Sequence, residues 1–335
     1  MSETCYTKKD YCSDQEVKWC PGCGDYVILS SLQQALAQSG KAREDIVCVS
    51  GIGCSSRLPY YLNSYGFHTI HGRAPSIATG IKLANPNLSV WVVTGDGDGL
   101  SIGGNHLIHA MRRNVDLNIL LFNNQIYGLT KGQYSPTSEK GKITKSSPHG
   151  TIDRTFNPGN LALGSGCTFV AKALDSDPKG LTDVMTAADR HQGTSFVEIY
   201  QNCVIFNDKA HDAYSNRNTR ADNALYVEDG KPMIFGKDRN KGVILRNFRL
   251  EVIELGGEFT EKDLLVHDKS NEAIAYMLIR QSSPPNFPMV LGVIYQSEDR
   301  PYEVLMEEQL KAAQAKKGKG DFKKLLHSGE TWTVE

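Results

Sequence analysis

Two acidic side chains lie in a glycine-rich segment that directly follows an apolar run, a combination that suits a diphosphate and its metal ion. The segment is Gly95-Asp96-Gly97-Asp98-Gly99, and residues 88–94 before it are predicted to form a buried strand. Glycine lets the backbone approach a phosphate closely, whereas two carboxylates repel a phosphate unless a cation lies between them. The segment therefore predicts a diphosphate that is bound through a cation such as Mg²⁺.

A second polar side chain is expected at the same edge of the fold. Asn124 follows another predicted strand, residues 118–123, and a predicted helix at residues 104–113 joins the two strands. In such a strand–helix–strand unit the parallel strands end on one side, and ligands bind beyond their carboxyl ends. We therefore expect Asp96 and Asn124 to lie close together, where a carboxylate and an amide oxygen can share a hard cation.

A nicotinamide-dinucleotide fingerprint does not fit the two glycine-rich turns of the chain. Counted from Gly97, the pattern Gly-x-Gly-x-x-Gly has Ile102 at its last glycine, and counted from Gly51 it has Ser56 there. Because that last glycine permits close packing of the helix on the strand, both turns argue against a bound dinucleotide.

Four of the eight cysteines fall where thiolates can meet at one metal centre. Two of them flank a Pro-Gly pair in a predicted tight turn, and each of the other two follows a predicted strand, at the edge where Asp96 is expected. Zinc, a redox dithiol and an iron–sulfur cluster are all compatible with this pattern. The four residues are Cys20, Cys23, Cys54 and Cys203.

The other cysteines need separate interpretations. Cys48 lies in a predicted strand and Cys167 lies directly before one, so both are expected to be buried as apolar side chains. Cys5 and Cys12 remain open as further ligands. A disulfide framework is disfavoured, because a cytoplasm keeps thiols reduced.

The elements that must position these groups alternate between strands and helices, which is typical of an α/β fold with a doubly wound, mostly parallel sheet. The long connection at residues 132–158 is rich in Gly, Ser, Thr, Pro and Lys, and predicts a functional loop. Residues 227–234 predict a hairpin around an Asp-Gly turn. Strands are expected at residues 46–50, 88–94, 118–123, 168–171 and 195–201, and helices at residues 30–38, 77–84, 104–113 and 180–190.

Three parts of the chain are expected from the distribution of these patterns. Residues 1–16 form an N-terminal arm, residues 17–210 form the domain that carries the motifs, and residues 211–335 form a C-terminal extension that packs on the core or on a partner. Between Lys311 and Lys324 a lysine-rich run predicts a solvated helix and tail.

Composition excludes several classes of function. The 37 basic and 38 acidic residues give a formal net charge of -1, which offers no basic surface for nucleic acid. The most apolar runs have the length of a strand and cannot cross a bilayer, and the first residues do not resemble a signal peptide. We therefore expect a cytoplasmic protein that binds neither nucleic acid nor membrane.

Six short motifs follow one another between residues 17 and 208: Cys20-Pro21-Gly22-Cys23-Gly24, Gly51-Ile52-Gly53-Cys54, His71-Gly72-Arg73-Ala74, Gly95-Asp96-Gly97-Asp98, Asn123-Asn124-Gln125-Ile126-Tyr127-Gly128-Leu129-Thr130 and Gln201-Asn202-Cys203. In this order they resemble the β subunit of the 2-oxoacid:ferredoxin oxidoreductases. The resemblance implies the thiamine-diphosphate-binding fold and three resident cofactors, namely thiamine diphosphate, Mg²⁺ and a [4Fe–4S] cluster. It also implies coenzyme A as co-substrate.

The resemblance further implies a role for each motif. The positions that match Cys20, Cys23, Cys54 and Cys203 ligate the cluster, and those that match Asp96, Asn124 and the carbonyl of Ile126 bind Mg²⁺. The expected cofactor-binding residues are Cys54, His71, Gly72, Arg73, Gly95, Asp96, Gly97, Asp98, Asn124, Ile126, Gly128 and Leu129.

Substrate choice is expected to depend on Lys131, with Arg73 as a second candidate. Relatives that act on 2-oxoglutarate resemble the run Leu-Thr-Lys-Gly-Gln-x-Ser-Pro-Thr at residues 129–137. A lysine there can meet the second carboxylate of 2-oxoglutarate, although a surface lysine is the simpler interpretation.

The implied reaction is a reversible, CoA-dependent oxidative decarboxylation of 2-oxoglutarate to succinyl-CoA and CO₂, with electrons passed through the cluster to ferredoxin. Its other expected partner is an α subunit, which supplies the glutamate that activates the cofactor, in a heterodimer or a dimer of heterodimers. Three alternatives remain open: the same enzyme class acting on pyruvate or other 2-oxoacids, a non-redox thiamine-dependent decarboxylase subunit with a structural zinc, and a non-catalytic scaffold that carries a cluster.

Overall fold

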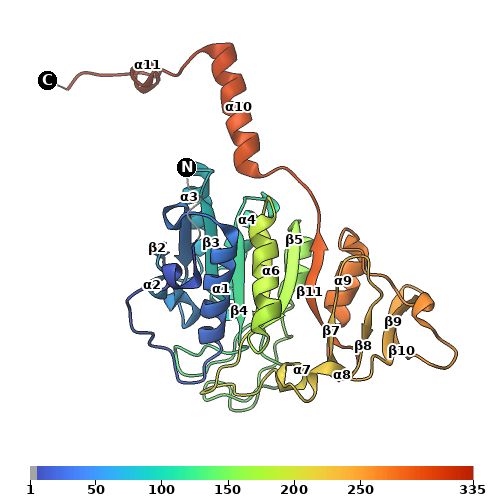
Figure 1. Ribbon diagram of the computed structural model, residues 1–335. Coiled ribbons are helices and arrows are strands. Elements are labelled where there is room, and N and C mark those ends of the chain that lie inside the picture. The colour runs from blue at the N-terminus through green and yellow to red at the C-terminus, as the bar shows by residue number, and fades with distance from the viewer. Residues whose placement is uncertain (1–5, 335) are drawn as a thin grey trace.

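The structure is a computed structural model that describes residues 6–334, and its centre is an eight-stranded sheet (Figure 1). The strand order is β2-β1-β3-β4-β6-β5-β11-β7, and every neighbouring pair is parallel except β5 and β11. This confirms the predicted α/β class and the mostly parallel sheet. The strands are β1 (Ile46–Ser50), β2 (Tyr65–His68), β3 (Ser89–Gly95), β4 (Asn118–Asn123), β5 (Phe169–Leu174), β6 (Ser195–Tyr200), β7 (Ala224–Tyr226) and β11 (Met289–Gln296).

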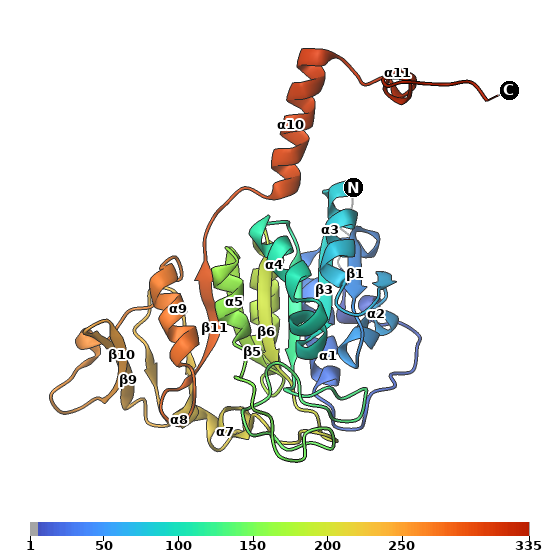
Figure 2. The same cartoon turned by 180° about the vertical axis from the view of Figure 1, so that it is seen from behind.

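The sheet is buried because alternate side chains of its strands enter two separate cores. On β3, Val90 and Val92 belong to one core, while Trp91 and Val93 belong to the other. Helices α1 (Asp25–Ser39) and α6 (Pro178–Arg190) cover one face, in front of the sheet in Figure 1. The opposite face, seen in Figure 2, is covered by α3 (Ala74–Ala84), α4 (Gly104–Arg112), α5 (Pro158–Gly164) and α9 (Glu272–Gln281).

The five predicted strands and four predicted helices are all present; β1 and β4 have the predicted bounds, and the ends of the others are shifted. Helix α1 begins at Asp25, earlier than predicted, directly after the second cysteine of the Cys-Pro-Gly-Cys turn. Cys48 and Cys167 are buried in the cores on opposite faces of the sheet, as their sequence positions predict.

The predicted hairpin at residues 227–234 is wrong in its pairing. Gly230 does form a turn with positive φ, but its backbone N–H donates to the carbonyl of His267. The segments on either side pair elsewhere, since β7 pairs with β11 and β8 (Ile234–Phe235) pairs with β9 (Lys241–Arg246). The segment therefore connects two sheets, and β10 (Arg249–Glu254) completes the smaller one.

The C-terminal region leaves the body of the molecule after β11. Helix α10 (Tyr302–Lys317) projects away from the sheet, and α11 (Phe322–Leu326) follows it (Figures 1 and 2). The lysines of this region are exposed, which confirms the predicted solvated helix and tail. The remaining helices are α2 (Leu58–Tyr61), α7 (Asp212–Ser215) and α8 (Arg220–Asn223). Over residues 6–334, no helix has both the length and the apolar character that a bilayer crossing needs.

Candidate functional site

The loops that follow the central parallel strands meet at one end of the sheet, the lower end in Figure 1. A cavity of about 200 Å³ lies among them. Its wall contains ten of the twelve residues predicted to bind the cofactor, and these come from the segments after β1, β3 and β4 and from the turn at His71. The ten are Cys54, His71, Gly95, Asp96, Gly97, Asp98, Asn124, Ile126, Gly128 and Leu129.

The buried carboxylate of Asp98 holds three of these segments together. Its Oδ1 lies 2.5 Å from His71 Nδ1 and accepts hydrogen bonds from the backbone N–H groups of Gly72 at 2.7 Å and Ile52 at 3.1 Å. Its Oδ2 accepts a hydrogen bond from Thr94 Oγ1 at 2.6 Å. Both carboxylate oxygens are therefore engaged within the protein, and Asp98 needs no cation to be satisfied.

Glycine is required where the chain passes this carboxylate. A Cβ atom on Gly51 would lie 1.9 Å from Asp98 Oδ2, and a Cβ atom on Gly72 would lie 2.5 Å from the backbone nitrogen of Gly103. Both contacts are shorter than atoms tolerate, so the approach of the three segments depends on the absence of side chains at these two positions.

Asp96 is equally buried but has different partners. Its Oδ2 accepts hydrogen bonds from Ser135 Oγ and Thr137 Oγ1, each at 2.5 Å. Burial raises the pKa of the Asp96 carboxyl to about 6, against the opposing effect of these hydroxyl groups. A cation bound at this carboxylate would offset the cost of its burial, because opposite charge favours the ionised form.

Asn124 and Ile126 form a tight turn beside Asp96. The N–H of Ile126 donates to Asn124 Oδ1 at 3.1 Å, and Gln125 between them has a positive φ of 57°. Tyr127 then folds back over Gly97, with its hydroxyl donating to the Gly97 carbonyl at 2.9 Å. A Cβ atom on Gly97 would lie 2.3 Å from the Tyr127 ring, so only glycine fits beneath it.

The Cys-Pro-Gly-Cys segment forms the predicted tight turn. Cys23 N–H donates to the Cys20 carbonyl at 3.0 Å, and Gly22 has a positive φ of 82°, which suits a type II turn with proline before glycine. Trp19 attaches this turn to the next cysteine, because its indole N–H donates to the carbonyl of Cys54 at 2.8 Å.

The four predicted cluster ligands gather around this turn. Burial, together with the neighbouring charges of Asp25, Cys203 and Cys20, raises the pKa of Cys54 to about 11. Burial also raises the pKa of Cys23 well above its usual range, with further contributions from Asp25, Cys203 and Cys54. The hydrogen bond from Trp19 brings Cys54 to the turn that carries Cys20 and Cys23.

Gly128 separates the cavity from this group of sulfur atoms. A Cβ atom added to Gly128 would lie 3.6 Å from Cys203 Sγ and 3.7 Å from Cys54 Sγ. Gly128 and Cys54 also line the cavity that contains Asp96. The cysteine group and the cavity therefore share a wall.

A single metal ion requires ligands that converge closely. Tetrahedral zinc, with Zn–S bonds of about 2.3 Å, needs sulfurs about 3.8 Å apart. Within residues 6–334, no three His, Cys, Asp or Glu side chains converge closely enough to hold one metal ion. Cys12 is exposed and its thiol donates to the Lys8 carbonyl at 3.5 Å, whereas Cys5 lies outside the described residues.

Apart from the cysteines, three predicted site residues lie outside the cavity wall. Gly72 packs on Gly103, and the guanidinium of Arg73 donates to the His71 carbonyl at 2.7 Å, so both support the turn that carries His71. Lys131 is exposed and has a positive φ of 77°, just beyond cavity-lining residues 128–130. Its N–H donates to the Gly128 carbonyl at 3.1 Å, which closes a turn next to the cavity.

Sequence reasoning missed Ser135 and Thr137 as partners of Asp96. Both are buried and belong to the long loop at residues 132–158, which was predicted to be functional without a role for single residues. Thr137 Oγ1 also lies 2.9 Å from Asn123 Oδ1, so the loop is attached to the ends of β3 and β4. The Ser-Pro-Thr run within the loop was the available signal.

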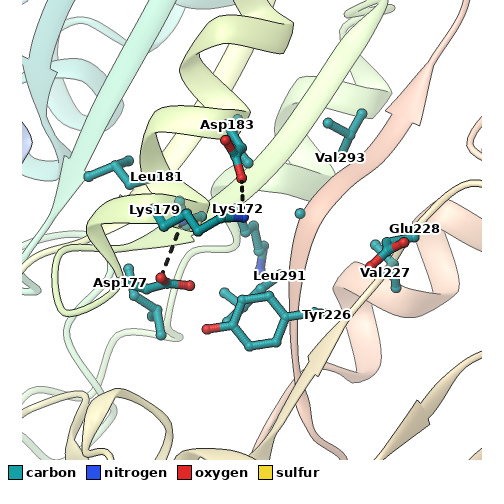
Figure 3. A pocket seen from close by; sticks show the side chains of 15 residues that line it. Lys172, Asp177, Lys179, Leu181, Asp183, Tyr226, Val227, Glu228, Leu291 and Val293 are labelled. Atoms are coloured by element: carbon teal, nitrogen blue, oxygen red, sulfur yellow. Dashed lines mark hydrogen bonds and ion pairs between the residues drawn. The ribbon is translucent and has the colours of Figure 1, made fainter. Parts of the chain in front are cut away.

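A larger cavity of about 400 Å³ lies beside α6, β5, β7 and β11 (Figure 3). Several of its charged groups have partners within the protein. Asp177 accepts a hydrogen bond from the N–H of Gly180, and Lys179 pairs with Asp183 at 3.1 Å. Most of its remaining wall is aliphatic, and it contains none of the predicted site residues.

Comparison with known proteins agrees with the geometry of the first cavity. Residues 51–199 match the family model described as the thiamine pyrophosphate enzyme, C-terminal TPP binding domain. The 2-oxoglutarate oxidoreductase subunit KorB of Mycobacterium tuberculosis is 52% identical over 331 residues, which are 98% of this chain and 88% of that protein. The 2-oxoacid:ferredoxin oxidoreductase subunit beta of Saccharolobus solfataricus is 48% identical over 57% of this chain and 63% of its own.

A solved structure is similar over nearly the whole chain. It is the 2-oxoglutarate:ferredoxin oxidoreductase from Magnetococcus marinus with 2-oxoglutarate, coenzyme A and succinyl-CoA bound. One of its chains is 32% identical and superposes with a TM-score of 0.76 over 97% of each chain.

The substitution Asp98→Ala tests whether this carboxylate holds the loops together. Four buried or partly buried donors would lose their acceptor, and each unsatisfied buried donor costs about 1–3 kcal/mol before relaxation. We expect the free energy of unfolding, measured by urea denaturation, to fall by about 3 kcal/mol. The control Asp183→Ala removes an exposed carboxylate and should change it by no more than about 0.5 kcal/mol. Equal effects of the two substitutions would contradict the role of Asp98.

Proposed function

We propose that this chain is the subunit that binds thiamine diphosphate, Mg²⁺ and a [4Fe–4S] cluster for the oxidation of 2-oxoglutarate. The chain belongs to the 2-oxoacid:ferredoxin oxidoreductase β-subunit family, and the proposal follows from that membership. The products are succinyl-CoA and CO₂, with coenzyme A as acyl acceptor and ferredoxin as electron acceptor. The same machinery can also run in the direction of CO₂ fixation.

The observation that carries this proposal is the wall shared by the cavity and the cysteine group. Gly128 and Cys54 line the cavity, and the sulfurs of Cys54 and Cys203 flank the position that a Gly128 side chain would occupy. A bound cofactor in the cavity and a cluster on the cysteines would therefore be neighbours. When bound, thiamine diphosphate supplies a carbanion that adds to the 2-oxo group, and the cluster accepts single electrons.

The residues of the cavity fit a diphosphate held through Mg²⁺. Mg²⁺ in such sites takes one or two carboxylates together with phosphate oxygens. Asp96 would supply the carboxylate, Asn124 an amide oxygen and Ile126 a carbonyl oxygen. Gly97, which accepts no side chain beneath Tyr127, keeps the backbone accessible beside them.

Four cysteines beside the cavity suit a [4Fe–4S] cluster. The sulfurs of Cys54 and Cys203 both lie next to Gly128, and Trp19 links Cys54 to the turn that carries Cys20 and Cys23. A [4Fe–4S] cluster is held by four thiolates. Cys20, Cys23, Cys54 and Cys203 would be its ligands.

Several relatives are named as β subunits, a name that implies an α subunit, and we propose the same kind of partner for this chain. The α subunit would supply the glutamate that activates the thiamine ring, in a heterodimer or a dimer of heterodimers. The cytoplasm, where thiols remain reduced, is the compartment we propose.

The substitution Cys203→Ser tests the cluster. Serine keeps the size of the side chain but is a poor iron ligand, so iron content and visible absorption should fall while thiamine diphosphate binding persists. Electron transfer from 2-oxoglutarate to ferredoxin should be lost. The control Cys12→Ser changes an exposed thiol outside the group. A full iron complement with unchanged ferredoxin reduction in Cys203→Ser would remove this residue from the site.

The substitution Asp96→Ala tests the magnesium ligand. It removes the carboxylate that compensates the charges of cation and diphosphate, and we expect a loss of several kcal/mol in cofactor affinity, where about 1.4 kcal/mol is tenfold. Thiamine diphosphate binding can be measured by calorimetry on the assembled complex. Asp45→Ala, which changes an exposed carboxylate before β1, is the control. Unchanged affinity after Asp96→Ala would exclude this residue as a ligand.

The substitution Lys131→Ala tests substrate choice. A charge-assisted contact to the second carboxylate of 2-oxoglutarate is worth about 1.5–3 kcal/mol, or roughly tenfold to a hundredfold. We expect kcat/KM to fall by that factor for 2-oxoglutarate and to change little for pyruvate and 2-oxobutyrate. The control Lys140→Ala alters an exposed lysine of the loop at residues 132–158 and should leave kcat/KM unchanged for all three substrates. Equal losses for all three substrates would mean that Lys131 supports the loop instead.

A further inference from the structure

Gln201 is a buried polar residue at the end of β6, two positions before Cys203. Its backbone N–H donates to the Asn123 carbonyl at 3.0 Å, which fixes it beside the end of β4. Its side chain packs closely on the cysteine turn, because a Cβ atom on Gly24 would lie 3.0 Å from Gln201 Cγ. Both backbone and side chain are therefore held in place.

The side-chain amide of Gln201 faces a sulfur atom. Its Nε2 lies 3.3 Å from Cys23 Sγ and 2.6 Å from the Asn202 carbonyl oxygen, so its two N–H groups have two acceptors. Within residues 6–334, this is the one side-chain hydrogen bond donated to any of the four grouped sulfurs. The contact joins the segment of Cys203 to the segment of Cys23.

The surroundings of Cys23 are otherwise acidic. Asp25 is almost fully buried two positions after Cys23, and its carboxyl group contributes to the raised pKa values of Cys23 and Cys54. Asp175 lies beside it and accepts a hydrogen bond from the Asn202 N–H at 2.7 Å. Nearby carboxyl groups disfavour a gain of negative charge at the sulfur, and an N–H group that donates to the sulfur favours that gain.

We propose, resting on the function proposed above, that Gln201 sets the reduction potential of the cluster through its hydrogen bond to the sulfur of Cys23. Reduction adds one electron to the cluster and increases the negative charge on its sulfur ligands. No bond forms or breaks, and the proton remains on the Gln201 nitrogen. Because the hydrogen bond is stronger in the reduced state, it raises the potential. Gln201 is a positioning residue in this account and touches no substrate.

Two substitutions separate the hydrogen bond from the shape of the side chain. Gln201→Leu removes the donor at similar volume, and Gln201→Glu keeps the length but replaces the donor with a carboxyl oxygen. The holoenzyme with its α subunit would be titrated anaerobically with dithionite, and the cluster followed by electron paramagnetic resonance. We expect the midpoint potential of the cluster to be highest in the wild type, lower in Gln201→Leu and lowest in Gln201→Glu. In Gln201→Leu the equilibrium constant for reduction of the cluster should fall by about tenfold, which corresponds to a potential lower by about 59 mV for one electron.

Gln33→Leu is a matched control. Gln33 is also a buried glutamine, and its Nε2 donates to the Tyr11 and Tyr61 carbonyls at 3.4 and 3.3 Å. Its replacement removes a buried amide without touching the cysteines, so the potential should match that of the wild type.

The outcomes distinguish this inference from the proposed function. Absence of iron and of the cluster signal from the wild-type holoenzyme would overturn the proposed function itself. If both Gln201 variants assemble the cluster as the wild type does and show the wild-type midpoint potential, only the role of Gln201 would be overturned. Loss of the cluster from both variants would also overturn it, because a residue that tunes the potential is dispensable for assembly. An equal shift of the midpoint potential in Gln33→Leu would mean that the change comes from a general loosening of the fold and not from the hydrogen bond to Cys23.

Discussion

The buried carboxylate of Asp98 is the interaction on which the arrangement of the site depends. It accepts hydrogen bonds from the end of β3, from the loop after β1 and from the turn that carries His71. Burial of a carboxylate without partners would cost free energy, but four hydrogen-bond donors compensate the carboxylate of Asp98. The glycines at positions 51 and 72 permit the close approach that these bonds require. Asp98 is thus committed to holding the loops, which leaves Asp96 as the carboxylate available to a cation.

The sheet brings the two halves of the site together. Parallel strands that end on one side deliver Asp96, Asn124, Cys54 and Cys203 to the same edge, although these residues are far apart in the sequence. The turn of Cys20 and Cys23 precedes α1 and is attached to the Cys54 segment through Trp19. Gly128 forms part of the wall between the cavity and the cysteine group, so a cofactor and a cluster bound there, as proposed, would be close neighbours.

Much of this arrangement could be predicted, because local sequence determines it. The strand ends, the tight Cys-Pro-Gly-Cys turn and the glycine-rich turn are encoded by neighbouring residues, and parallel topology then places them on one edge. Long-range partners could not be predicted in the same way. Ser135 and Thr137 meet Asp96 only because a long loop folds back over the site. The hairpin at residues 227–234 was mispredicted because its flanking strands pair with β11 and β9, which the local Asp-Gly signal cannot reveal.

Anaerobic reduction of ferredoxin by the purified complex tests the central claim most directly, which is that this chain places a thiamine cofactor next to an iron–sulfur cluster. The complex of this chain with its α subunit would be mixed with 2-oxoglutarate, and the cluster signal followed before and after addition of coenzyme A and ferredoxin. The account predicts that the cluster becomes reduced by 2-oxoglutarate, and that ferredoxin reduction then proceeds with formation of succinyl-CoA. A complex that contains zinc in place of iron, or that decarboxylates 2-oxoglutarate without reducing a cluster, would contradict it.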